Sequence, residues 1–261
     1  MKKRWIILWL LIGSTCILLM YGAYRYYAPP QIMQPYLLPS NHEDTLRIAY
    51  IGDSWAYLHR EHDCIIADIL EDSLSQPVKV HSYGICGLTS KEIYENLYQN
   101  NDLKRFLQKR RYEYCIVSAG INDTYKIMST HYYKKSMDGI IQFLLTNNIH
   151  PVILEIPDYN IQESFERQTI IRKGLRYLSM LINNMPLDCK QMYREALDDI
   201  INKRNYQDKV SINRYKSWNN NYTMDLNNLY QNDGLHLNEK GYLKLDSLIA
   251  KEIISSITIE K

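Results

Sequence analysis

One serine and one histidine, far apart in the chain, have the neighbours expected of a nucleophile and its general base. Ser54 follows the residues Ile-Gly-Asp at the end of an apolar stretch, and His236 lies three residues after Asp233. A serine hydroxyl is a weak nucleophile at neutral pH, so it needs a base that takes its proton and a third group that orients the base. The sequence therefore predicts acyl transfer, with Ser54 as nucleophile, His236 as base and Asp233 as orienting carboxylate.

Two glycine-containing segments between these residues can supply the donors that the same reaction needs. Residues 84–87 read Gly-Ile-Cys-Gly, and residues 120–123 read Gly-Ile-Asn-Asp. The negative oxygen that forms during acyl transfer is stabilised by backbone N–H groups and neutral side-chain amides. We expect this oxyanion hole to consist of the backbone N–H groups of Ser54 and Gly87 and the side-chain amide of Asn122.

In this order the segments resemble the signature blocks of the SGNH (GDSL-type) hydrolase family, named for Ser, Gly, Asn and His. The resemblance covers about residues 45–255 and carries the family's site onto Ser54, Gly87, Asn122, Asp233 and His236. Gly87 fits the second block better than Gly84, because it follows a strand and precedes a helix start. The resemblance implies an ester hydrolase that needs no cofactor and no metal.

Three further residues beside the signature positions are expected to shape or support the site. Trp55 stands where the family name implies leucine, which leaves the shape of the nearby acyl pocket open. Asp53 is an alternative orienting carboxylate, but a residue adjacent to the serine usually points away from it. Asp123 is a candidate to hold the loop that carries Asn122.

Apolar stretches alternate with amphipathic ones from residue 46 onward. The expected strands are residues 46–51, 78–83, 114–119, 151–156 and 210–214. The expected helices are residues 65–74, 90–98, 132–147, 161–184, 190–203 and 239–254. This alternation predicts an α/β fold, a parallel sheet of about five strands covered by helices on both faces. The family resemblance implies the three-layer α/β/α, flavodoxin-like version of this fold.

The candidate site residues follow the ends of the expected strands. Ser54, Gly87 and Asn122 each come shortly after an apolar strand. Ligands of open parallel sheets bind beyond the carboxyl ends of the strands. One shared active site at that edge is therefore expected without reference to any family.

The N-terminus is expected to be a membrane anchor outside the globular domain. Lys2, Lys3 and Arg4 precede an uncharged, almost wholly apolar stretch over residues 5–23. As a helix these nineteen residues would span about 28 Å, enough to cross a bilayer core. Positive residues favour the cytoplasmic side, so the domain would be extracytoplasmic, periplasmic or on the cell surface. A cleaved signal peptide is the alternative, although Tyr-Gly-Ala at residues 21–23 is a poor cleavage site.

Four prolines after the apolar stretch predict an extended tether. The expected organisation is an anchor over residues 1–23, a tether over 24–44 and a hydrolase domain over 45–261. Residues 216–230 are rich in Asn and Tyr without periodicity, and they read equally well as a wall of the substrate site or as a solvated loop.

Composition excludes some other classes of function. The chain has 261 residues and a net charge of +2, from 31 basic and 29 acidic side chains. Nucleic-acid-binding proteins usually carry a strong basic excess, so no nucleic-acid partner is expected. His59 and His62 have no further ligand at a metal-like spacing, and a solvated helix start is the preferred interpretation. Cys115 is expected to be buried, and Cys64 and Cys86 are a candidate disulfide in an outward-facing domain.

Three functions remain open from the sequence. The first is an esterase or deacylase acting on an ester-bearing small molecule, an acylated glycan or another envelope component. The second is an acyltransferase that uses the same triad, with a sugar hydroxyl in place of water. The third is a non-catalytic binding domain, which the intact set of candidate catalytic residues disfavours. A lipase is less favoured, because no long apolar lid is evident.

Overall fold

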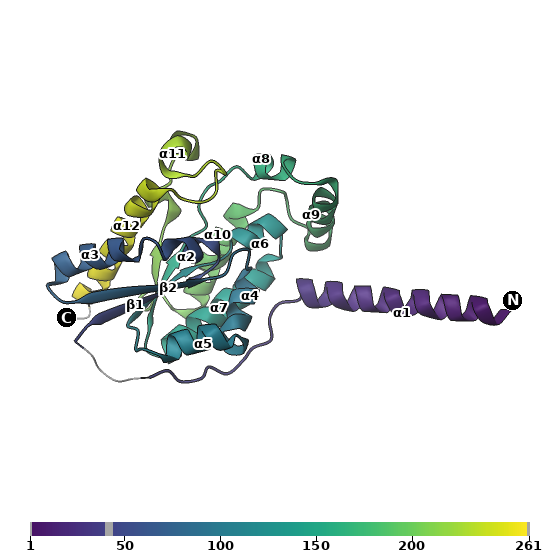
Figure 1. The fold of residues 1–261 in the computed structure, drawn as a ribbon, viewed down its shortest axis with the longest axis horizontal. Helices are drawn as coiled ribbons and strands as arrows, with labels where there is room; N and C mark the ends of the chain where they lie inside the picture. The colour runs from purple at the N-terminus through teal and green to yellow at the C-terminus, as the bar shows by residue number, and fades with distance from the viewer. Residues whose placement is uncertain (1, 40–43, 260–261) are drawn as a thin grey trace.

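The computed structural model describes residues 2–39 and 44–259, so residues 1, 40–43 and 260–261 of the expected anchor, tether and domain lie outside the described residues. Its centre is a five-stranded sheet in which every strand pair is parallel, in the order β2-β1-β3-β4-β5 (Figure 1). The strands are β1 (Leu46–Gly52), β2 (Val78–Gly84), β3 (Tyr114–Ser118), β4 (His150–Leu154) and β5 (Ser211–Asn213). The predicted α/β fold is confirmed.

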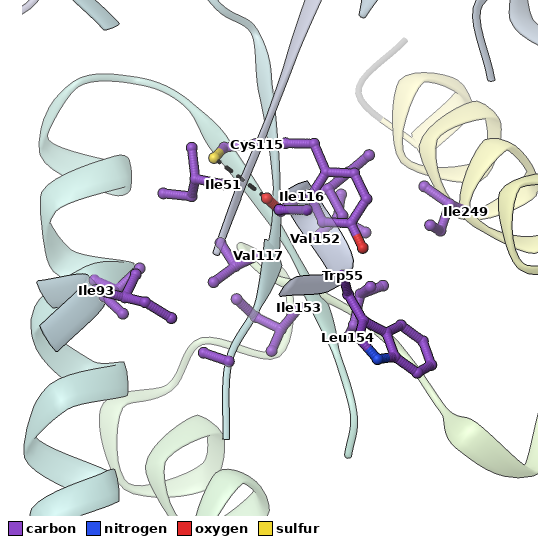
Figure 2. Packing of buried hydrophobic residues seen from close by; sticks show 14 of the residues in the cluster. Ile51, Trp55, Ile93, Cys115, Ile116, Val117, Val152, Ile153, Leu154 and Ile249 are labelled. Carbon is purple, nitrogen blue, oxygen red and sulfur yellow. Dashed lines mark hydrogen bonds between the residues drawn. The ribbon is translucent and has the colours of Figure 1, made fainter. Parts of the chain in front are cut away.

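Helices cover both faces of the sheet, which explains why the central strands are apolar on both sides. One face carries α3 (Asp63–Leu74) and α12 (Glu239–Ile259). The other carries α4 (Ser90–Gln99), α5 (Asn101–Gln108), α7 (Thr130–Thr146) and α10 (Lys190–Arg204). Figure 2 shows this sandwich in the core, where Ile93 of α4 and Ile249 of α12 lie on opposite sides of the strands. Cys115 is buried in β3, as expected.

The strand register brings the carboxyl ends of three strands together. Gly52, the last residue of β1, is paired with Gly84 of β2 and with Ser118 of β3. A Cβ on Gly52 would lie 2.1 Å from the carbonyl oxygen of Ser118, so the close approach of β1 and β3 requires glycine here. The segments that follow these strands consequently start at one edge of the sheet.

Two expected elements differ from the observed ones. The single helix expected over residues 161–184 is two helices, α8 (Ile161–Glu166) and α9 (Ile170–Asn183). They are separated because the side chain of Thr169 caps α9 by accepting from the backbone N–H of Arg172. The stretch over residues 216–230, which showed no periodicity, contains the helix α11 (Tyr222–Leu229).

The N-terminal segment consists of a long helix and an extended stretch that lies along the domain. Helix α1 (Lys2–Tyr27) points away from the domain (Figure 1). In the extended stretch, the backbone N–H of Met33 donates to the hydroxyl of Tyr94 at 2.8 Å, and that of Leu38 donates to Oδ1 of Asn147 at 2.7 Å. The described part of the Pro-rich segment is therefore fixed to α4 and to the end of α7.

Candidate active site

Ser54 is positioned by the turn between β1 and the short helix α2 (Ser54–His59). The carboxylate of Asp53 caps this helix by accepting from the backbone N–H of Trp55 at 3.0 Å. A serine at the first position of a helix after a parallel strand presents its hydroxyl beyond the carboxyl edge of the sheet. Ser54 accordingly lines a cavity of about 690 Å³ at this edge.

A continuous hydrogen-bonded chain joins Ser54, His236 and Asp233. Nε2 of His236 lies 2.8 Å from Oγ of Ser54, and Nδ1 of His236 lies 2.5 Å from Oδ2 of Asp233. With its proton on Nδ1, the imidazole donates to the carboxylate and accepts from the serine hydroxyl. This is the geometry that a general base for serine requires.

The carboxylate of Asp233 is held in its ionised form by the loop that carries it. Burial raises its pKa, but the backbone N–H of Leu235 and the side chain and backbone N–H of His236 outweigh burial, so the pKa is lowered. The same loop is fixed by the Tyr222 hydroxyl, which donates to the carbonyl of Gly234 at 2.7 Å. The imidazole is therefore oriented by the Asp233 carboxylate and by a loop that the Tyr222 hydroxyl holds in place.

The expected oxyanion donors line the same cavity as Ser54. Asn122 is in α6 (Ile121–Lys126), directly after β3, and Gly87 follows β2 with a φ of +81°. Nδ2 of Asn122 lies 3.5 Å from Oδ2 of Asp53, a long contact that leaves the amide able to turn to a substrate oxygen. The structure thus brings Ser54, Gly87 and Asn122, one residue from each of the first three signature segments, to the same cavity.

Gly84 and Gly87 have different surroundings. A Cβ on Gly84 would lie 2.1 Å from the backbone nitrogen of Tyr57, whereas a Cβ on Gly87 would meet nothing within 4 Å. Gly84 therefore allows β2 to approach α2, while Gly87 lies on the cavity wall.

Asp123 connects the Asn122 segment to the start of α4. Its carboxylate is buried and accepts from the backbone N–H of Ser90 at 2.7 Å and from the Ser90 hydroxyl at 2.6 Å. Burial raises the pKa of Asp123 to about 6, against the opposing effect of the two Ser90 donors. Any shift of Asn122 relative to the segment after β2 would break these buried hydrogen bonds.

Asp53 and Trp55 lie behind the nucleophile. Trp55 is buried, with its ring 5.6 Å from that of Trp218, and it is outside the set of residues that line the cavity, so its contacts are those of the supporting role among the two expected for it. Burial raises the pKa of Asp53 to about 7, and this carboxylate contacts Trp55, Ser118 and Asn122. The carboxylate that contacts the His236 ring is that of Asp233.

The outer wall of the cavity includes Tyr222, from the stretch 216–230 for which a wall of the site was one of two expectations, and segments in which the sequence indicated no site residue. It is formed by the end of α6, by α8, by the start of α9 and by α11, through Tyr125, Glu163, Arg167, Gln168, Arg172 and Tyr222. The helix caps at Asn160 and Thr169 were the available signals, because they mark the starts of α8 and α9.

His59 is not at a solvated helix start, contrary to expectation. It is buried at the end of α2, with Nδ1 2.9 Å from Asp63 of α3 and Nε2 3.0 Å from Asp246 of α12. Burial lowers the pKa of His59, but the two carboxylates outweigh burial and raise it to about 9. Within residues 2–39 and 44–259, no group of three or more His, Cys, Asp or Glu side chains could hold a metal ion. Cys64 and Cys86 are free thiols, so the candidate disulfide is not formed.

Similarity searches agree with this architecture. The sequence profile of the family described as GDSL-like Lipase/Acylhydrolase matches residues 48–249. The lipase/acylhydrolase from Enterococcus faecalis is 16% identical, with a TM-score of 0.53 over 80% of this chain and 96% of that one. The psychrotrophic esterase EstA from Pseudoalteromonas sp. is 17% identical, with a TM-score of 0.51 over 83% and 98%. An acetyl xylan esterase, AlAXEase, is 15% identical, with a TM-score of 0.51 over 81% and 100%. No curated protein matches the chain in sequence.

A parallel α/β/α sandwich with a serine, a histidine and a carboxylate in contact at the strand ends defines a class of hydrolases. The profile match extends over most of the chain, and the similar solved structures share the fold. The chain belongs to the GDSL-like lipase/acylhydrolase family and is an ester hydrolase.

Proposed function

We propose that the protein is a membrane-anchored serine esterase in which Ser54, His236 and Asp233 carry out two-step acyl transfer. Ser54 Oγ forms a bond to the ester carbonyl carbon while His236 takes the hydroxyl proton. The C–O bond of the ester then breaks, and His236 gives that proton to the departing alcohol. Water attacks the acyl-enzyme by the same route, releasing the acid and regenerating Ser54. The observation that carries this proposal is the unbroken hydrogen-bonded chain from Asp233 to Ser54.

The developing oxyanion would be stabilised by the backbone N–H groups of Ser54 and Gly87 and by the amide of Asn122. All three residues line the cavity that contains the serine hydroxyl. Donors held in place before the reaction stabilise the transition state without reorganisation, which makes this the largest single contribution in many enzymes. Asp53 and Asp123 act as supports for these donors, through Asn122 and Ser90.

Helix α1 would hold the enzyme at the membrane. Its segment Trp5–Tyr27 is long and apolar enough to cross a bilayer, and none of its most apolar window is buried. The basic residues at positions 2–4 would keep the N-terminus in the cytoplasm, which leaves the domain outside. An enzyme anchored there would act on an acylated glycan or another ester-bearing envelope component.

The function is tested by hydrolysis of nitrophenyl esters with acetyl, butyryl and longer acyl chains. The full chain in detergent should hydrolyse at least one of them, and His236→Ala should lower the rate by several orders of magnitude. Leu243→Ala, on the exposed surface of α12, is the matched control and should retain the rate. Equal rates for the full chain and His236→Ala would refute the proposed mechanism.

A further inference from the structure

Helix α9 has its apolar side turned away from the protein. Seven large apolar or aromatic side chains on it are between 48% and 88% exposed: Ile170, Ile171, Leu175, Tyr177, Leu178, Leu181 and Ile182. At 3.6 residues per turn they fall within an arc of about 160°. A surface helix of a globular protein normally presents the opposite arrangement, with its apolar stripe on the core.

The side of α9 that faces the protein carries two buried polar residues beside the partly buried Met180. Arg176 and Ser179 are both buried, at 5% and 4% exposure. The Arg176 guanidinium lies over the rings of Tyr125 and Phe165, at 4.7 and 5.2 Å from their centroids. These contacts fix which side of the helix points outward. A rotation that hid the apolar side chains would remove the buried cation from its aromatic partners.

Helix α9 lies beside the end of the candidate membrane helix. The hydroxyl of Tyr27, the last residue of α1, is 2.7 Å from that of Ser179. Between the two helices is a groove of about 410 Å³, lined by Gly22, Ala23 and Tyr26 on one side and by α9 side chains on the other. In Figure 1, α9 lies across the direction of α1, on the side of the domain from which α1 departs.

We propose that the exposed apolar side of α9 lies in the interfacial layer of the membrane that α1 crosses. This inference rests on the anchoring role given to α1 above. An amphipathic helix in the interface buries its apolar side about 5–10 Å into the boundary between headgroups and acyl chains. Arg25 and Arg172, both exposed, lie near the groove, where they can meet lipid phosphates.

A bilayer fits this surface better than a second copy of the chain does. The end of α1 is hydrogen-bonded to α9 through Tyr27 and Ser179, so a chain anchored by α1 would already hold α9 near the membrane surface. Because α1 already holds the chain at the bilayer, binding of α9 to the same bilayer costs little further translational freedom, as for the second of any two linked binding elements. A protein partner would have to enter the same narrow space between the domain and the lipid.

Docking of α9 would also place the catalytic cavity at the membrane surface. Tyr125, Gln168 and Arg172 line both the groove beside α1 and the cavity that contains Ser54. An ester-bearing molecule held in the lipid surface would therefore have a short path to the nucleophile. The inference predicts a preference for esters presented in a bilayer over the same esters in solution.

The test uses the full chain in vesicles of phosphatidylcholine and phosphatidylglycerol, with a polarity-sensitive fluorophore on a single introduced cysteine. The exposed cysteines are removed as Cys16→Ala, Cys64→Ser and Cys86→Ser, while the buried ones remain. One variant carries Leu181→Cys on α9. The matched control carries Leu243→Cys, also at an exposed position, on α12, a helix that lies on the side of the domain away from α1 (Figure 1).

The fluorophore at position 181 should emit at shorter wavelength and be quenched by lipids that carry a spin label near the headgroup. The fluorophore at position 243 should show neither effect. Equal, water-like emission at both positions would overturn the proposal. Short-wavelength emission at 181 without lipid quenching, increasing with protein density, would assign the surface to a second copy instead. Failure of the full chain to float with the vesicles would reject both the anchor and the docking. Loss of esterase activity alone would reject only the mechanism.

Discussion

At the scale of single residues, the chemistry depends on where a few protons and partial charges are held. In the proposed mechanism, His236 accepts from Ser54 because its contact with Asp233 keeps the proton on the other ring nitrogen. Asp233 can do so because two backbone N–H groups and the imidazole keep its pKa low. Removing any one of these groups should impair the transition state far more than the fold.

Asn122 provides the sharpest test of the oxyanion hole. Loss of one such donor typically costs about 10²–10³ in kcat, or roughly 3–4 kcal/mol. Asn122→Ala should therefore lower kcat by that factor with little change in KM, because the contact strengthens in the transition state. Asn122→Asp should be at least as damaging, since it places a negative charge beside the oxyanion. Kinetics on nitrophenyl esters, normalised to folded enzyme, provide the measurement. A kcat for Asn122→Ala within about threefold of the unsubstituted enzyme would remove Asn122 from the site.

Asp233→Asn should separate orientation from simple proximity. The amide fills the same space but cannot favour the required tautomer of His236, and such a change costs about 10⁴ in kcat in a comparable triad. Asp53→Asn should cost much less, because this carboxylate contacts the Trp55 backbone, Ser118 and, at 3.5 Å, the Asn122 amide, and not the His236 ring. Comparison of the two kcat values decides between the carboxylates. A larger loss for Asp53→Asn would mean that the orienting residue is misassigned.

Sequence reasoning found the residues that meet at the strand ends, because three of them directly follow apolar strands. It was wrong for His59 and left the role of Trp55 open, and both have the same cause. The six-residue helix α2 was not expected, and it turns both side chains into the core. A short helix has too few residues for its buried side to be recognised from periodicity.

At the scale of elements, α2 is fixed at both ends. Its first residue is Ser54, and its last residue, His59, contacts α3 through Asp63 and α12 through Asp246. The buried pair with Asp246 and the partly buried pair with Asp63 hold the helix that presents the nucleophile. Removing one member of such a group is costly, because the remaining charges stay buried without a partner.

The His59 cluster predicts a pH dependence of stability. The pKa of His59 is raised from 6.5 to about 9 in the folded chain. The contribution of charged His59 to the free energy of unfolding should be fully present below about pH 6.5 and be lost as the pH rises through 9. Its upper limit is about 3 kcal/mol. His59→Gln should lack this loss. Denaturant titrations of both proteins between pH 6 and 10 provide the test, and parallel curves would show that His59 is uncharged in the fold.

The strands were predictable from the sequence, but the arrangement of the cavity wall was not. Each expected strand overlaps the observed one, since a buried parallel strand is an apolar run with clear ends. Residues 161–184 carry an amphipathic pattern, yet the pattern does not reveal that α9 faces outward with its apolar side. Periodicity shows that the helix has an apolar side, whereas only the folded structure shows whether that side faces the core or the solvent.

At the scale of the whole molecule, the domain, the extended segment and α1 act as one unit. The described part of the Pro-rich segment is bonded to α4 and α7, and Lys91 donates to the carbonyls of Arg25 and Ala28 at the end of α1. A fixed connection of this kind would hold the cavity at a set height above the membrane. A flexible tether would let it sample a wide volume.

The anchor predicts the behaviour of the intact chain in cells. The full-length protein should sediment with membranes, resist extraction by high salt and be released by detergent. Its mass should remain that of the 261-residue chain, 31.0 kDa. Protease added to intact cells should degrade the domain if it faces outward. Recovery of a soluble chain that lacks residues 1–23 would instead identify a cleaved signal.

Covalent labelling of Ser54 is the most direct test of the proposed mechanism. A fluorophosphonate reacts with a serine hydroxyl only when a base activates it and donors stabilise the resulting oxyanion. The full chain should be labelled, and peptide mass spectrometry should find the phosphonate on Ser54. Ser54→Ala should remain folded without being labelled, and His236→Ala should react far more slowly. Undiminished labelling of Ser54→Ala, or a phosphonate found on another serine, would contradict the assignment of Ser54 as the nucleophile.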